Sequence, residues 1–212
     1  VMLSMQTIYT LILTTLGFKY LNTMSFLSKE LIFTDKEIYF LGDDGFKYHV
    51  MMDWERSIMK HHADYVCSNG GDILEIGFGM GISADYIQAN NPKSHTIIEC
   101  HPQVIPRALA WAEGKDNVTI IEGDWYNKWS ELSTYDGIFY DAYGDDNMYG
   151  LQHIIPSLIK KGGIFTWWNI NKEQSSKGFI DFDNIEWHCI EIQSDKNDYF
   201  NNDVYYMPMK QF

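Results

Sequence analysis

The sequence predicts an α/β protein with a doubly wound, mostly parallel seven-stranded sheet. Short apolar runs alternate with helical patterns from Ile73 to Trp168, which is typical of parallel strands covered on both faces. Two further strand-like runs, Trp187–Ile192 and Val204–Met207, flank the polar loop Ser194–Asp203. We therefore expect the sheet to end in a C-terminal antiparallel hairpin.

The elements of the sheet follow from hydrophobic periodicity. Five strands are predicted before the hairpin: Ile73–Ile76, Thr96–Glu99, Val118–Glu122, Gly137–Tyr140 and Gly163–Trp168. Helices are predicted between them at Met80–Ala89, Pro102–Glu113 and Met148–Ile159. Pro102 falls in the first turn of its helix, where proline is tolerated.

Residues 1–48 are predicted to form an N-terminal extension, and residues 49–212 the main domain. The extension contains a helix-like stretch near Ser4–Ser28. After it we expect a β-hairpin, Leu31–Phe33 and Ile38–Leu41, turning at residues 34–37. We expect the extension to pack on the domain or on a partner subunit, which makes a homodimer plausible.

The main domain begins with a predicted helix from His49 to Cys67. Met51, Glu55 and Met59 are four residues apart, so they share one face of that helix. An acid with apolar neighbours on each side fits a buried carboxylate with a charged partner. The alternative is a surface acid on an amphipathic helix.

Composition limits the classes of function. The net charge of -13 argues against a nucleic-acid or anionic-membrane surface and is compatible with a cationic small substrate. The uncharged stretch Val1–Phe18 has several polar residues and no basic start, so it fits neither a signal peptide nor a membrane span well. The three cysteines have no metal-binding spacing, so we expect reduced thiols, a cytoplasmic protein and no metal.

A glycine-rich loop, Gly77-Phe78-Gly79-Met80-Gly81, follows the first parallel strand. Glycines at this position permit a tight turn and a close approach of a ligand to the backbone. A dinucleotide site wants a third glycine three residues after the second, where this chain has Ile82. The spacing thus suits a nucleoside ligand without a pyrophosphate.

Acids stand at the ends of the next three strands. Glu99 is placed to accept hydrogen bonds from ribose hydroxyls, and Asp124 with Trp125 could hold an adenine. Asp141 ends the fourth strand. Since parallel strand ends converge on one crevice, these groups are expected to form one site. By contrast, Asp145-Asp146 looks like part of a solvated loop.

Six segments resemble the guanidinoacetate N-methyltransferase family and the related fungal arginine δ-N-methyltransferases. They are VMMDWERSIM, ILEIGFGMGIS, HTIIECHP, IEGDWYN, YDGIFYDAY and GGIFTWWN, and they cover about residues 49–170 in order. The resemblance implies a Rossmann-like methyltransferase that transfers the methyl group of S-adenosyl-L-methionine to a guanidino nitrogen of a small molecule, such as guanidinoacetate or arginine.

The resemblance also implies residue roles. Glu55 and Asp141 would bind the guanidino group and act in catalysis, and Ile170 and Asn171 would touch the rest of the substrate. The implied cofactor contacts are Met51, Met59, Gly77, Phe78, Gly79, Met80, Gly81, Ile82, Glu99, Cys100, His101, Asp124, Trp125 and Asp141.

Elementary chemistry supports the carboxylate pair independently. Two carboxylates can clamp a planar guanidinium through parallel hydrogen bonds. A guanidinium is a poor nucleophile, because its pKa lies above about 12, so a carboxylate must take a proton as the nitrogen attacks.

Two other functions remain open. One is transfer to another amine on the same scaffold, aminopropyl transfer included. The segment Asn171–Ile185 after the fifth strand favours it, because it is shorter than in guanidinoacetate methyltransferases. The other is an inactive cofactor-binding protein that acts through oligomerisation.

Overall fold

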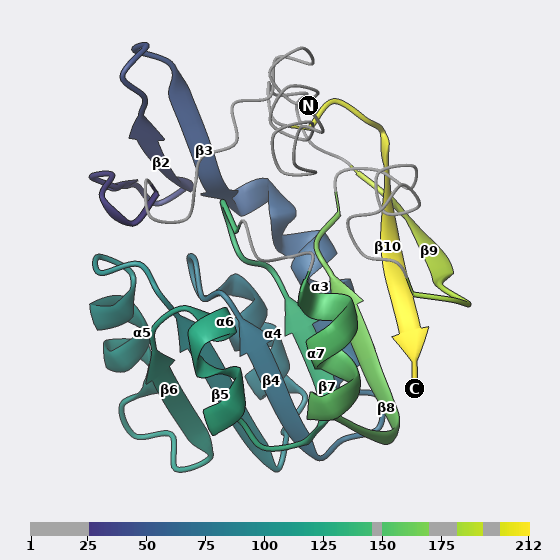
Figure 1. Cartoon of the computed structure of the whole chain (residues 1–212). Helices are drawn as coiled ribbons and strands as arrows, with labels where there is room; N and C mark the ends of the chain where they lie inside the picture. Colours follow the sequence, from purple (N-terminus) through teal and green to yellow (C-terminus); the bar gives the residue numbers. More distant parts are fainter. Residues whose placement is uncertain (1–25, 146–149, 170–181, 193–199) are drawn as a thin grey trace, which may run out of the picture.

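The computed structural model describes residues 26–145, 150–169, 182–192 and 200–212. Its main sheet has seven strands in the order β6-β5-β4-β7-β8-β10-β9 (Figure 1). Their bounds are β4 Asp72–Ile76, β5 Ser94–Glu99, β6 Val118–Glu122, β7 Tyr135–Tyr140, β8 Ile159–Trp167, β9 Glu186–Glu191 and β10 Val204–Gln211. Strands β4 to β8 are parallel, and β10 is antiparallel to both β8 and β9. The predicted fold class is confirmed.

The strand order changes direction beside β4. The chain first builds β5 and β6 on one side of β4, and then β7 and β8 on the other. In a doubly wound sheet this arrangement opens a crevice at the carboxyl ends of the strands, and ligands bind there. The glycine loop follows β4 directly, so the topology places it at this crevice.

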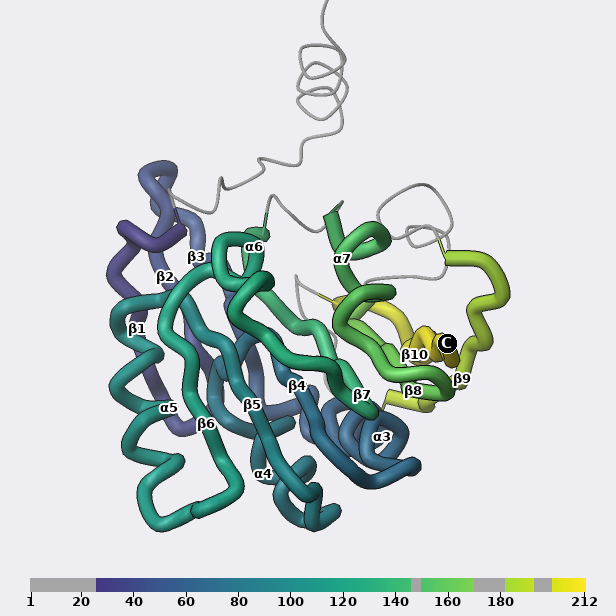
Figure 2. Tube along the Cα trace, turned by 60° about the horizontal axis from the view of Figure 1, so that its bottom comes forward, coloured from purple at the N-terminus to yellow at the C-terminus, as the bar shows by residue number. Residues whose placement is uncertain are grey.

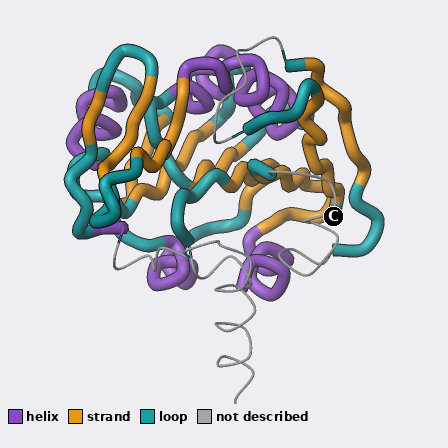
Figure 3. Tube along the Cα trace, turned by 90° about the horizontal axis from the view of Figure 1, so that it is seen from above, coloured by secondary structure: helices purple, strands orange, loops and turns teal. Residues whose placement is uncertain are grey.

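Helices cover both faces of the main sheet (Figure 3). One face carries α3 (Arg56–Val66), α4 (Ile82–Ala89) and α5 (Ile105–Ala112). The other carries α6 (Trp125–Lys128) and α7 (Leu151–Leu158). Short 3-10 turns stand before α3, at Asp53–Glu55, and after α6, at Trp129–Glu131. Because both faces are covered, the central strands read as continuous apolar runs.

A small antiparallel sheet precedes the main domain. It consists of β1 (Ile32–Phe33), β2 (Glu37–Leu41) and β3 (Lys47–Met52), so the predicted hairpin is present. In Figures 1 and 2 it lies on the opposite side of the molecule from β9 and β10. Strand β3 crosses the predicted boundary after residue 48, so the extension and the domain share this sheet.

The expected helix from His49 to Cys67 begins later than predicted. Residues 49–52 belong to β3, where Met51 pairs with Ile38 and Met52 with Glu37. The α-helix starts only at Arg56, after the 3-10 turn. The helical spacing of Met51, Glu55 and Met59 was therefore misleading over its first turn, because pairing with β2 outweighs a local helical pattern.

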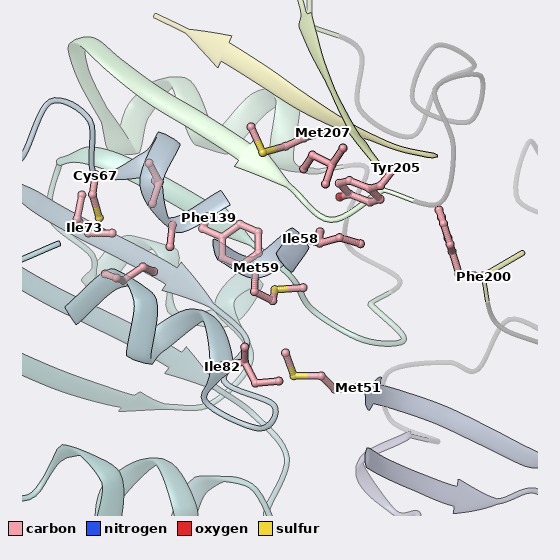
Figure 4. Packing of buried hydrophobic residues seen from close by; sticks show 14 residues of the cluster. Met51, Ile58, Met59, Cys67, Ile73, Ile82, Phe139, Phe200, Tyr205 and Met207 are labelled. Atoms are coloured by element: carbon pink, nitrogen blue, oxygen red, sulfur yellow. The ribbon is translucent and has the colours of Figure 1, made fainter. Parts of the chain in front are cut away.

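The hydrophobic core under α3 and α4 joins the first sheet, the main sheet and the C-terminal hairpin. Ile58, Met59, Ile73 and Phe139 are completely buried in it. Figure 4 shows Met51 beside Ile82 at the margin of this cluster and Met207 of the C-terminal hairpin at another margin. The core thus connects the strand before α3 with both the glycine loop and the hairpin.

Some expectations fall outside the described residues. They include most of the helix near Ser4–Ser28, the first two residues of the helix at Met148–Ile159, and the substrate residues Ile170 and Asn171. Among the helices that the structure describes, none is long and apolar enough to cross a membrane.

Candidate active site

The glycine loop is held by unusual backbone geometry. Gly77, Gly79 and Gly81 have φ angles of 96°, 53° and 76°, a region that favours glycine. A Cβ atom on Gly77 would lie 2.1 Å from the carbonyl oxygen of Asp141, and one on Gly79 would lie 2.6 Å from the Met51 sulfur. The loop backbone is thus closely packed between the end of β7 and the end of β3.

Glu99 connects the glycine loop to the turn after β5. Its buried carboxylate accepts backbone N–H groups of Phe78 at 2.9 Å and of Cys100 and His101 at 2.8 Å. Burial raises the pKa of Glu99, and these donors act in the opposite direction. The carboxylate therefore holds two loops of the crevice together, while its predicted bond to a ribose stays a prediction.

Asp124 and Trp125 begin α6 at the end of β6. The Asp124 carboxylate accepts the Tyr126 N–H at 3.0 Å and so caps the helix. Trp125 is 3% exposed, and its indole N–H donates to Asp145 at 2.5 Å. The Tyr140 hydroxyl donates to the same oxygen at 2.6 Å. Asp145, expected in a solvated loop, instead anchors two aromatic side chains beside the crevice.

Glu55 reaches the crevice from the 3-10 turn before α3. It is 2% exposed, and its two oxygens accept the Met52 N–H and the Trp168 indole N–H, each at 2.9 Å. Burial, and then the negative charge of Asp141, raise its pKa to about 8, although both hydrogen bonds act the other way. Trp168 follows β8, so Glu55 links the turn before α3 to the end of β8.

Asp141 lies at the end of β7, where its N–H donates to the Ile76 carbonyl at 2.8 Å. Burial raises its pKa to about 7, with further contributions from the charges of Glu75 and Glu99. Within the described residues, no basic side chain contributes to the pKa shift of either Glu55 or Asp141. The two acids therefore form a site that becomes negative when they ionise, and no cation from the described part of the chain favours that ionisation.

The other predicted cofactor residues surround the same loop. Met59, Phe78, Ile82 and His101 are buried, and Met80 and Cys100 are partly exposed. The Met80 N–H donates to the Met51 sulfur at 3.2 Å, which ties the loop to β3. Their contact with a cofactor stays a prediction. No cluster of metal-ligating side chains occurs in the described parts of the chain.

Sequence reasoning did not find Trp168 as a partner of Glu55, nor the buried pair His62 and Tyr205. Trp167, the last residue of β8, is buried, while the next residue, Trp168, reaches Glu55. His62 is completely buried. Its partners lie 104 and 143 residues away, so no local pattern marks them.

Comparisons with known proteins agree with this geometry. The chain is 37% identical over 163 residues to protein arginine N-methyltransferase 2 of Candida glabrata, covering 71% of this chain and 37% of that protein. The protein of the same name from Saccharomyces cerevisiae is 36% identical over 163 residues, covering 70% of this chain and 38% of that protein. The chain thus spans under two fifths of the length of these relatives.

Among solved structures, spermidine synthase from Thermotoga maritima has the same fold. The TM-score is 0.61 at 12% identity, covering 86% of this chain and 72% of that one. The family model described as guanidinoacetate N-methyltransferase matches residues 33–178, which include the glycine loop, Glu55 and Asp141. The chain therefore belongs to the guanidinoacetate N-methyltransferase family.

Proposed function

We propose that this chain is an N-methyltransferase that transfers the methyl group of S-adenosylmethionine to a guanidino nitrogen. The observation that carries the proposal is the pair Glu55 and Asp141, two carboxylates with raised pKa values beside a glycine loop. Glu55 is buried and Asp141 partly buried, and two negative charges held there are costly unless a cation joins them. A guanidinium supplies that cation together with planar donors that match carboxylate oxygens.

The crevice fits S-adenosylmethionine as the methyl donor. At Gly77 and Gly79 the neighbouring Asp141 carbonyl and Met51 sulfur leave no room for a Cβ atom, so the loop has bare backbone at both positions. Glu99 ends β5, and Asp124 follows β6. When bound, this cofactor supplies a sulfonium methyl group. The sulfonium is itself a cation, so the negative charge around Asp141 suits both reactants.

The chain's own residues would prepare the acceptor nitrogen. At neutral pH Glu55 holds a proton for much of the time, and a bound guanidinium lowers its pKa by direct charge attraction. The ionised carboxylate would then take one N–H proton from the guanidinium as that nitrogen accepts the methyl group that the cofactor would supply. The products are a methylguanidinium, a neutral thioether and one proton on the carboxylate.

The site supports one part of the acceptor, its guanidino group, and leaves the rest of the molecule open. The family description names guanidinoacetate, and the relatives are named for protein arginine. We propose a small guanidino compound or free arginine, with protein-bound arginine as the alternative that an assay decides. The likeness to spermidine synthase is one of fold. An amine lacks the planar set of paired donors with which a guanidinium matches carboxylate oxygens.

The test is methyl transfer by the full chain with S-adenosylmethionine and a panel of acceptors. The panel holds guanidinoacetate, free arginine, an arginine peptide and putrescine, and the readout is the mass of one added methyl group. We expect a guanidine to be methylated. Product from putrescine alone, or from no guanidine, would contradict the proposal.

Glu55→Gln sharpens this test. We expect turnover to fall by roughly 10²- to 10⁴-fold, as for the loss of a general base, with cofactor affinity within about threefold. Glu113→Gln is the matched control, because Glu113 is an exposed acid just after α5. Full activity in Glu55→Gln would show that Glu55 is not the base.

A further inference from the structure

Three buried side chains form a continuous hydrogen-bonded chain next to the site. The Tyr205 hydroxyl lies 2.9 Å from Nε2 of His62, and Nδ1 of His62 lies 2.7 Å from the Thr166 hydroxyl. The Thr166 hydroxyl donates to the Pro208 carbonyl at 2.6 Å. All three side chains are fully buried, and none is among the residues to which the proposed function assigns a role.

The direction of every bond in this chain is fixed by counting hydrogens. Thr166 has one hydroxyl hydrogen, which it gives to the Pro208 carbonyl, so it must accept from His62. A neutral His62 therefore carries its hydrogen on Nδ1 and accepts the Tyr205 hydroxyl on Nε2. The Tyr205 oxygen in turn accepts the backbone N–H of Asn169 at 3.0 Å.

This chain of bonds cannot carry a proton away from the site. It ends on a backbone carbonyl, which has no proton to pass on. Burial, and then the neighbouring His61, lower the pKa of His62 to about 3, so its ring stays neutral at working pH. The arrangement is therefore suited to holding groups in place.

The hydrogen bonds of Tyr205, His62 and Thr166 hold the segment after β8 in place. Strand β10 pairs with β8 through Lys210 and Gln211, and Pro208 has no N–H with which to extend that ladder. Beyond it, the Thr166 hydroxyl reaches the Pro208 carbonyl and the Tyr205 hydroxyl reaches the Asn169 N–H. Side chains thus connect the two strands where backbone pairing ends.

Trp168 stands directly at this connection. Its N–H donates to the Tyr140 carbonyl at 2.9 Å, its ring lies 6.3 Å from the Tyr205 ring, and its indole N–H donates to Glu55. We propose that the Tyr205–His62–Thr166 chain positions Trp168 and thereby orients the Glu55 carboxylate for its reaction. The role of Glu55 in that statement rests on the proposed function.

Two matched pairs of variants test the proposal. Tyr205→Phe removes a hydroxyl and keeps the ring, with Tyr206→Phe on the same strand as its control. Thr166→Val removes the other hydroxyl at nearly constant shape, and Thr166→Ser restores it. We expect Tyr205→Phe and Thr166→Val to lower kcat about tenfold at neutral pH, with the cofactor Kd changed less than about twofold. Thr166→Ser should recover most of the activity.

The readout specific to positioning is the ionisation of Glu55. The groups that face it are the Asp141 charge, the Trp168 and Met52 donors, and the Tyr205 ring. A loosened Trp168 donates a weaker hydrogen bond to Glu55, so the pKa of Glu55 rises. The acid limb in a plot of kcat against pH should then move to higher pH by about half a unit or more. A lower melting temperature with an unmoved limb would overturn the proposal.

Two measurements do not depend on turnover, so they separate this proposal from the proposed function. Nitrogen NMR should show His62 as the neutral Nδ1–H form from pH 5 to 9; titration in that range, or hydrogen on Nε2, overturns the proposal. Carbon NMR of labelled glutamate reads the pKa of Glu55 directly. That pKa should rise in Tyr205→Phe and Thr166→Val, even if no guanidine proves to be a substrate, and an unchanged value overturns the proposal.

Discussion

At the scale of single residues, Glu55 and Asp141 are acids whose burial opposes their ionisation. The sequence indicated Glu55 through its apolar neighbours Met51 and Met59, and the residue is indeed buried. The predicted helical spacing was wrong for Met51, because Met51 lies on β3 rather than on the helix. The partners of Glu55 could not be predicted in the same way, since Trp168 lies 113 residues away.

Asp141→Asn should make the chain more stable above neutral pH. In the folded chain the pKa of Asp141 is about 7, against an ordinary value of 3.8, so folding favours the protonated form. Below about pH 4 Asp141 is protonated in both the folded and the unfolded state, so it does not lower the free energy of unfolding. As the pH rises to 7 the unfolded state loses its proton first, and the stability contributed by the protonated form is lost.

The expected difference is about 1–3 kcal/mol in favour of Asp141→Asn at pH 8, shrinking towards zero at pH 4. Urea unfolding at pH 4, 6 and 8 measures it. Asp116→Asn, at an exposed loop acid, serves as the control and should show no such trend. If the difference in unfolding free energy between Asp141→Asn and the parent chain is the same at all three pH values, the pKa of Asp141 is not raised.

At the scale of elements, the glycine loop was the part of the site most readable from sequence. Its position after a strand and its GxGxG spacing are local features, and the positive φ angles agree with them. Helix α6 was missed, because a four-residue helix has too little periodicity to detect. The cap at Asp124 is visible only once Tyr126 is seen to donate to it.

Gly77→Ala should disrupt the loop more than its backbone angle alone requires. An alanine at positive φ costs roughly 1–2 kcal/mol, and here the added Cβ would also meet the Asp141 carbonyl at 2.1 Å. Gly114→Ala is the matched control, since Gly114 has a φ of 75° and open space around its Cβ position. We expect Gly77→Ala to abolish S-adenosylmethionine binding measured by calorimetry, and Gly114→Ala to leave it unchanged. Equal losses of affinity in the two variants would show that the contact with the Asp141 carbonyl is not the cause.

At the scale of the whole molecule, the alternation of patterns along the chain predicted the doubly wound sheet and the closing hairpin. It did not predict the way β10 meets β8, because that depends on Pro208 and on side chains brought together from α3, β8 and β10. The net charge of -13 is likewise a property of the entire chain. It produces a negative potential that extends beyond the two acids of the site.

That potential makes capture of the acceptor depend on salt. A cationic guanidine is attracted to a chain of net charge -13, and added salt screens this attraction over about 10 Å at 0.1 M. We expect kcat/KM for the guanidine to fall about three- to tenfold between roughly 20 and 500 mM NaCl, through KM, while kcat stays constant. The inhibition constant of a neutral urea analogue is the control, and it should change little, because a ligand without charge gains nothing from the field. If the kcat/KM for the guanidine and the inhibition constant of the urea analogue respond equally to salt, the acceptor is not recognised through its charge.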